Sequence, residues 1–232
     1  MRVLLIILSV IIWTLQVNGQ VENRRKVEDI RQEFAQKKHL EFSKGDKYID
    51  ENEIAGSPYL NKQFQSSYIL KINGAEIKDM LLRYNIYNDE MEFRKDGKVM
   101  SIAFPSEIQR INMEGKVFTY ARYTTPKINS SGFFQIIYDG NYQLMKKDQV
   151  TLSSPSEKTH SGDSLKFERK LPQFYLRYSG GTAHLVYSQK TLIKVLQPIP
   201  QNVIDYIKSN KIKTKDEKQL VDLMEYMDQS EN

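Results

Sequence analysis

The segment KINGAEIKDMLLRYNIYNDEMEFRKDGKVMSIAF, residues 71–104, contains the pattern that decides the fold. Apolar and polar residues alternate along it, and the pairs Asn73-Gly74 and Asp96-Gly97 interrupt the alternation. A period of two is typical of β-strands, and these pairs suit tight hairpin turns because both central residues must adopt positive φ. The segment therefore predicts consecutive antiparallel strands.

The same turn chemistry recurs on the C-terminal side of this segment, at Glu114-Gly115, Asp139-Gly140 and Gly180-Gly181. Strands and helices do not alternate as in a parallel sheet, so residues 55–187 predict an antiparallel meander of about eleven strands. Such a sheet is expected to curl, or to form a sandwich or a barrel. The fold class is therefore mainly β (α+β), with short strands that include separate ones at 165–169 and 174–178.

Side-chain alternation also predicts which residues face the core. One face of the strand before Tyr87 carries Met80, Leu82, Tyr84 and Ile86. Across the Asn73-Gly74 turn, the matching face is expected to carry the apolar residues Tyr68, Leu70 and Ile72.

The last part of the chain, residues 188–232, has helical periodicity instead. Thr214 and Glu217 fit a capping box, which predicts that the last helix opens there. After this box, four apolar residues recur on one side of the helix: Leu220, Leu223, Met224 and Met227. Such a stripe is usually the face that a helix packs on its own domain, so we expect these helices to be integral to the β domain.

The N-terminal residues 1–19 are expected to form a secretory signal peptide. Arg2 precedes a short apolar run, and Val17 and Gly19 suit signal peptidase, which predicts cleavage before Gln20. We therefore expect export to the periplasm, or an extracellular or outer-membrane-associated location, with no membrane-spanning segment after cleavage. Residues 20–54 are rich in charge and predict an N-terminal arm, either with a short helix near 22–38 or as a solvated, partly ordered segment. The chain has no cysteine, which excludes disulfides, thiolate metal sites and cysteine nucleophiles.

Three stretches carry a resemblance to a family: GSPYLNKQF (56–64), LLRYNIYNDEMEF (81–93) and VIDYIKSNKIKTKDEKQLVDLMEYM (203–227). They resemble an uncharacterised family of secreted, β-rich proteins of Gram-negative bacteria that end in a short helical region. The resemblance covers roughly residues 55–228 and implies a fold and a location. It implies no chemistry, because the function of that family is unknown.

Catalytic and metal-binding signatures are scarce. The three histidines, His39, His160 and His184, have no partners at metal-ligand spacing, and no nucleotide-binding loop is present. Asp89, Glu90 and Glu92 could supply the two acids of a glycosidase, although acids beside a turn are more often simply solvated, and they lack the spacing of a calcium loop. The sequence therefore assigns no catalytic residue, cofactor or metal.

Aromatic and amide side chains beside the Asn88 turn form the one candidate binding surface, because such groups can stack on sugars or peptides. Its residues are Arg83, Tyr84, Asn85, Tyr87, Asn88 and Asp89. The same residue types are also common in half-buried strands. The sequence favours a non-enzymatic envelope or periplasmic module with a binding or structural role. Its partner is then an envelope protein or polysaccharide and not nucleic acid. The alternative is a carboxylate-dependent hydrolase acting on an envelope or extracellular polymer.

Overall fold

The computed structural model describes residues 35–37, 42–44, 47–49, 54–153 and 165–230 of the 232-residue chain. The expected signal peptide, residues 1–19, lies outside these residues. Of the residues expected to form a helix near 22–38, the structure describes only Ala35–Lys37, and these three residues form a strand.

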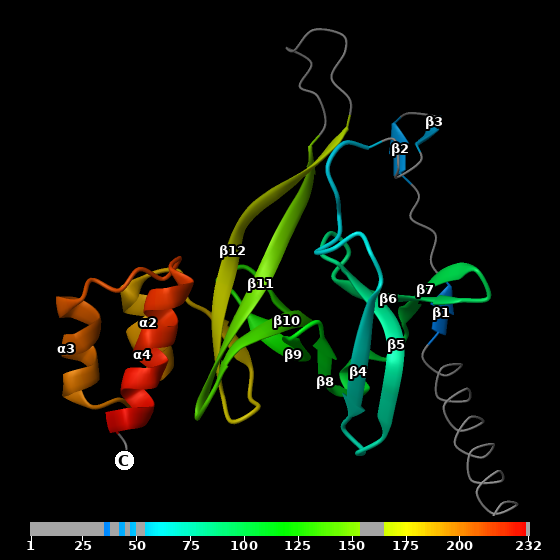
Figure 1. The fold of residues 1–232 in the computed structure, drawn as a ribbon. Coiled ribbons are helices and arrows are strands. Elements are labelled where there is room, and N and C mark those ends of the chain that lie inside the picture. The colour runs from blue at the N-terminus through cyan, green and yellow to red at the C-terminus, as the bar shows by residue number, and fades with distance from the viewer. Residues whose placement is uncertain (1–34, 38–41, 45–46, 50–53, 154–164, 231–232) are drawn as a thin grey trace, which may run out of the picture.

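Strands dominate the described part of the chain, and three helices follow them (Figure 1). In chain order the elements are β1 (Ala35–Lys37), β2 (Phe42–Lys44), β3 (Lys47–Ile49), β4 (Gln65–Lys71), β5 (Glu76–Asn85), β6 (Glu90–Lys95), β7 (Lys98–Ile102), the 3-10 helix η2 (Pro105–Glu107), β8 (Ile108–Met113), β9 (Lys116–Thr124), β10 (Asn129–Asp139), β11 (Tyr142–Ser153), β12 (Lys166–Tyr178), β13 (Ala183–Leu185), α2 (Gln189–Leu196), α3 (Gln201–Ser209) and α4 (Glu217–Ser230).

Two meanders build the main sheet, whose described strands follow the order β1-β7-β6-β5-β4-β8-β9-β10-β11-β12-β13. The first meander runs from β4 to β7, and η2 then returns the chain to the free edge of β4, where β8 pairs. As predicted, Asp96-Gly97 between β6 and β7 turns with positive φ at both residues, 49° and 73°. The second meander runs from β8 to β13.

The end of the sheet closes on itself. β13 pairs antiparallel with β12 and also parallel with β9, where Ala183 lies opposite Tyr123. Strands β9 to β13 therefore form a ring. The rest of the sheet continues from β9 as a curled, open part, in the order β8, β4, β5, β6, β7 and β1. β8 and β13 share one edge of β9, since β8 pairs near its start, at Phe118, and β13 near its end. The sheet is thus mixed and partly ring-like.

The expected core face of β5 is confirmed, because Met80, Leu82, Tyr84 and Ile86 are all buried. The face expected on β4 is wrong. Ile69 is fully buried, whereas Ile72 is 67% exposed. The residues of β4 that lie opposite the core residues Met80 and Ile77 of β5 are Ser67 and Ile69, so the alternate set of β4 faces the other side of the sheet. A bulge in β5 places two residues opposite Tyr68, and the alternation along β4 is unbroken.

Strands β9 to β12 have 9 to 13 residues, and they are longer than the short strands that we expect from the sequence. The two strands expected at 165–169 and 174–178 are one continuous strand, β12. Pro172, which has no N–H to donate, lies between the two expected strands. In the structure Lys147 pairs with Gln173 and Gln149 with Lys170, so Leu171 and Pro172 form a bulge in β12 opposite Asp148, and pairing continues on both sides of it.

The three C-terminal helices pack on one side of the ring, beside β10 and β11 (Figure 1). The stripe of Leu220, Leu223, Met224 and Met227 is buried in one cluster with sheet residues such as Leu144 and others from β12. The predicted mainly β fold with helices packed on a curled sheet is confirmed. Among the described residues, no helix combines the length and the apolar character that crossing a membrane requires.

The predicted start of the last helix is wrong by two residues. Thr214 lies in a turn in which the Asp216 N–H donates to the Lys213 carbonyl at 3.0 Å. Asp216 is the cap instead, because its Oδ1 accepts from the Gln219 N–H at 3.1 Å and its carbonyl accepts from Leu220. Thr214 is therefore part of a turn that precedes α4 and does not cap the helix.

Candidate functional site

The six residues of the expected binding surface lie at the end of β5 and in the turn that leads to β6. Tyr84 is only 2% exposed and Asn85 is fully buried, whereas Tyr87 is 38% exposed. The other three, Arg83, Asn88 and Asp89, are partly buried. The structure therefore brings these residues together, but it places them mostly in the interior of the molecule rather than on one open face.

Arg83 and Asn85 hold a buried acid. Nε of Arg83 donates to Oε2 of Glu92 at 2.8 Å, and Nδ2 of Asn85 donates to Oε1 of the same carboxylate at 2.8 Å. Glu92 is 1% exposed, and these two donors offset the cost of removing its carboxylate from water. The guanidinium of Arg83 also lies 3.7 Å from the ring centroid of Tyr59. This group of side chains ties β5 to β6 and to the segment before β4.

Asp89 makes a second buried group that links the two meanders. Its Oδ1 accepts from the Tyr84 hydroxyl at 2.6 Å and from the Phe133 N–H at 3.2 Å, and its Oδ2 accepts from Lys147 Nζ at 2.7 Å. Gly132 makes room for this contact, since a Cβ there would lie 2.1 Å from Asp89 Oδ2. Asp89 thus connects the β5–β6 turn to β10 and β11.

Burial changes the proton affinities in this group. Burial lowers the pKa of the Lys147 ammonium, although the nearby Asp89 carboxylate acts in the opposite direction. Burial raises the pKa of Tyr84 well above its ordinary value, and the charge of Asp89 raises it further. Tyr84 therefore stays a neutral hydrogen-bond donor to Asp89 at neutral pH.

The acids considered for a glycosidase are engaged in structural contacts. Asp89 and Glu92 are paired as described, and Glu90 accepts from the Ser101 hydroxyl at 2.8 Å. A glycosidase needs one acid that carries a proton and a second that faces the substrate, and these contacts favour neither. Among the described residues no three His, Asp or Glu side chains gather as metal ligands. His184 is exposed on β13, and His39 and His160 lie outside the described residues.

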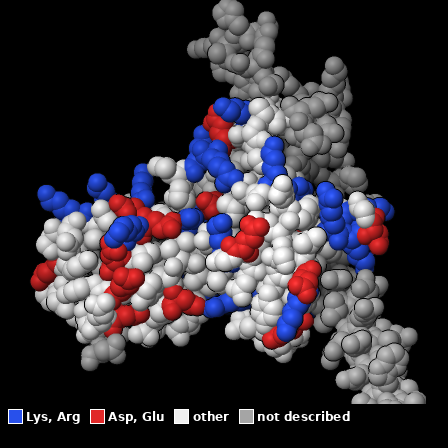
Figure 2. All heavy atoms as spheres, viewed as in Figure 1, with Lys and Arg blue, Asp and Glu red and all other residues white. Residues whose placement is uncertain are grey.

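Charge is mixed over the face seen in Figure 2, where Lys and Arg are interspersed with Asp and Glu. A polar hollow lies between η2–β8 and the ring, and its cavity volume is about 790 Å³. Strands β8, β9 and β12 contribute Arg110, Arg122 and Arg177 to it, and β11 contributes Gln143. We call it the arginine hollow. Its size is within the range of small-ligand sites.

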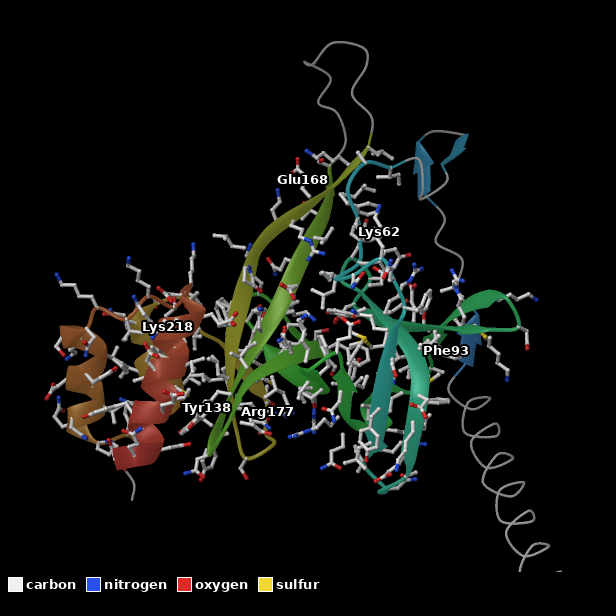
Figure 3. The ribbon with its side chains drawn as sticks, viewed as in Figure 1. Lys62, Phe93, Tyr138, Glu168, Arg177 and Lys218 are labelled. Atoms are coloured by element: carbon white, nitrogen blue, oxygen red, sulfur yellow. The ribbon has the colours of Figure 1, made fainter. Side chains whose placement is uncertain are left out.

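Two of the arginines are held in place by a chain of hydrogen bonds. Asp139 accepts from Arg110 through Oδ2 and from Gln143 Nε2 through Oδ1, the latter at 2.6 Å. Gln143 Oε1 in turn accepts from Arg177 Nε at 2.8 Å. Figure 3 labels Arg177 on β12, on the side of the open sheet, whereas Tyr138 lies on the side of the helices. The chain fixes both guanidinium groups before any ligand arrives.

Electrostatics in the hollow favour an anion. Burial lowers the pKa of the Arg177 guanidinium, and the charge of Asp139 opposes that effect. Burial alone would raise the pKa of Asp139, but hydrogen bonds from Gln143 and Arg110 together lower it. Among the described residues, the one ion pair that these three arginines form joins Arg110 to Asp139, so positive charge is left in excess.

The arginine hollow could not be found from local sequence patterns. Arg110 and Arg177 lie 67 residues apart, and no motif surrounds either of them. They meet only because β12 returns toward β9 through β13. A basic excess in residues 55–187, with 18 Lys or Arg against 13 Asp or Glu, was the available signal, and it does not single out a position.

Comparison of the chain with protein-family models, with curated proteins and with solved structures finds no match. The family resemblance noted from residues 56–64, 81–93 and 203–227 therefore stays a prediction.

Proposed function

We propose that this chain is an exported, non-enzymatic binding module of the cell envelope, and that it binds an acidic polysaccharide segment in the arginine hollow. The observation that carries the proposal is the pair of arginines, Arg110 and Arg177, held in fixed positions at a polar hollow by Asp139 and Gln143. Fixed donors bind an anion more tightly because less side-chain freedom is lost on binding.

The donors left over in the hollow support an anionic ligand. A guanidinium carries five N–H donors in a planar fork. Arg177 uses two of them on Gln143, and Arg110 uses one on Asp139. Arg122 adds a third, exposed guanidinium on β9. Arginine pairs with carboxylates in two parallel hydrogen bonds, which uronic-acid carboxylates can accept.

The remaining lining supports a sugar. Side chains with hydroxyl or amide groups also line the hollow, and they belong to Ser106, Gln109, Ser131 and Thr182. Such groups donate and accept hydrogen bonds to sugar hydroxyls, and the open shape of the region suits a chain that continues past the site. The N-terminal residues 1–19 support export, since they have the composition of a signal peptide.

Calorimetric titration of the mature chain tests the proposal. The probes are short oligogalacturonates and the same oligomers as methyl esters, which keep the backbone and remove the charge. We expect the acid form to bind and the ester to bind at least about tenfold more weakly. Arg177→Gln and Arg110→Gln should each weaken binding of the acid form by about tenfold or more.

Arg94→Gln is the matched control, because Arg94 lies on β6 outside the hollow and should leave binding unchanged. Equal binding of the acid and the ester would contradict the anion site. Shortening of the oligomers during incubation, measured by chromatography, would instead support the hydrolase.

A further inference from the structure

A second hollow lies where the end of β9 meets the start of α2. Its walls come from Thr124 and Pro126 after β9, from His184 and Leu185 on β13, and from the first turns of α2, and its cavity volume is about 570 Å³. We call it the α2 groove. It shares no lining residue with the arginine hollow.

The groove follows from the ring closure. His184 lies opposite Thr124 in the parallel β13–β9 pair, so the chain leaves β13 beside the end of β9. Ser188 then caps α2, as its Oγ accepts from the Thr191 N–H at 3.2 Å. The first turns of α2 are therefore fixed against the end of the ring, and the groove between them is preformed.

The charged side chains of the groove are all basic. Lys190 and Lys194 line it, are exposed, and lie one helical turn apart on α2. Neither forms an ion pair with an acid in the described part of the chain. Two like charges one turn apart repel each other, so an anion bound between them would relieve the repulsion.

The rest of the groove is apolar to a degree that the arginine hollow is not. Leu185 and Val195 are partly buried in its wall, and Tyr187 beside them is 57% exposed. An exposed tyrosine next to lysines is typical of sites where one part of the ligand is apolar and another is charged.

We infer that the α2 groove binds a single-chain anionic amphiphile, which is an alkyl chain with a carboxylate or phosphate head. The ammonium groups of Lys190 and Lys194 bind the head, and Leu185, Val195 and Tyr187 cover the chain. A small amphiphile is favoured over an acidic peptide, because the groove has the size of a small-ligand site and a polar peptide would leave its apolar wall without a partner. The inference goes beyond the proposed saccharide site and does not depend on it.

The test is a titration of the mature chain with dodecanoate and dodecyl phosphate, below their micelle concentrations, followed by calorimetry. Dodecyl maltoside supplies the chain without the charge, and acetate supplies the charge without the chain. We expect saturable one-to-one binding of both anionic amphiphiles, and binding at least about tenfold weaker for the two controls. Lys190→Gln combined with Lys194→Gln should weaken dodecanoate binding by at least about tenfold.

Lys208→Gln combined with Lys215→Gln is the matched control, since both lysines are exposed outside the groove and the same charge is removed. Arg177→Gln should also leave dodecanoate binding unchanged, which separates this inference from the proposed function. Val195→Ser should weaken dodecanoate more than it weakens acetate.

Three results would overturn the inference. Equal binding of dodecyl maltoside would show an apolar site without charge selection, and binding of a Glu-rich peptide without dodecanoate would show a peptide site. Flotation with anionic phosphatidylglycerol vesicles, without binding of the monomeric amphiphiles, would show docking to a membrane surface instead of binding of a single molecule.

Discussion

At Gly132 a single added atom would collide with an ion pair. The Asp89–Lys147 ion pair passes directly over its Cα, and a Cβ there would lie 2.1 Å from Asp89 Oδ2 and 2.7 Å from Lys147 Nζ. Lys147 also donates to the Phe133 carbonyl at 3.1 Å, so the backbone of β10 and the ion pair are locked together. The two meanders are connected at this point.

We expect Gly132→Ala to destabilise the protein by roughly 2–4 kcal/mol, because the added methyl group must displace Asp89 or Lys147 from a largely buried pair. Urea unfolding followed by far-UV circular dichroism measures the change in the free energy of unfolding. Ser131→Ala, at the neighbouring partly buried residue, is the control and should change it by less than about 0.5–1 kcal/mol. A free energy of unfolding in Gly132→Ala equal to that of the parent chain would show that the pair can move without cost.

Tyr138 connects β10 to α4 through a hydrogen bond to Asp228 Oδ2 at 2.6 Å. This hydrogen bond, together with desolvation and the charge of Asp228, raises the pKa of Tyr138 to about 12 from 10.0. The folded state therefore holds the phenol proton more tightly than the unfolded state. The stabilisation is complete below pH 10 and is lost as the pH rises from 10 toward 12.

The stability difference between the parent chain and Tyr138→Phe should accordingly be largest at pH 9 and should shrink by pH 11.5. Urea unfolding of both proteins at the two pH values measures it, and the comparison cancels the other groups that titrate in this range. A difference that stays constant between the two pH values would count against the link between β10 and α4.

The cap of α4 can be tested by substitution in the same way. Asp216→Ala removes the side-chain acceptor of the Gln219 N–H and should cost about 0.5–2 kcal/mol. Thr214→Val, which removes the hydroxyl of the cap residue predicted from sequence and keeps the side-chain volume, should cost less. Thermal unfolding by circular dichroism compares the two variants, and a larger effect at Thr214 would restore the predicted capping box.

Elements with strong local signals could be predicted from the sequence, and their register could not. The turn at Asp96-Gly97 and the buried face of Met80 and Leu82 depend on neighbouring residues, which are visible in the sequence. The bulge at Leu171 and Pro172 and the shift between Ser67 and Ile69 depend on how each strand pairs with its neighbour, which no local sequence pattern determines. A register shift by one residue reverses the exposed and buried faces, so such errors invert whole strands.

At the scale of the whole molecule, one apolar cluster joins the C-terminal helices to the ring. Leu220, Leu223, Met224 and Met227 are buried there against sheet residues. Burial contributes about 1.5–3 kcal/mol for each such side chain, so together they are comparable to a typical net stability of about 5–15 kcal/mol.

Deleting residues 200–232 should therefore expose part of the ring and cause aggregation or a large drop in the melting temperature. Thermal melts of the mature and truncated chains, with light scattering, measure this. An unchanged melting temperature would show instead that the helices are an independent appendage, available for a partner.

The candidate sites also depend on the arrangement of the whole molecule, and for this reason the sequence does not reveal them. The expected surface at Arg83–Asp89 depended on local composition, and the structure turns most of it inward. The arginine hollow and the α2 groove both depend on the β13–β9 contact, which joins distant segments. A single sequence without an alignment carries no record of such a contact.

That contact also has a consequence for the order in which the chain is made. Tyr123 and Ala183 are 60 residues apart, so the ribosome completes β9 well before its last partner exists. During that interval the end of β9 presents backbone N–H and C=O groups that another copy could pair with. The three residues of β13 cover this edge in the finished chain. Chains whose synthesis stops before residue 183 would keep it open, and intermolecular pairing is the fate we expect for them.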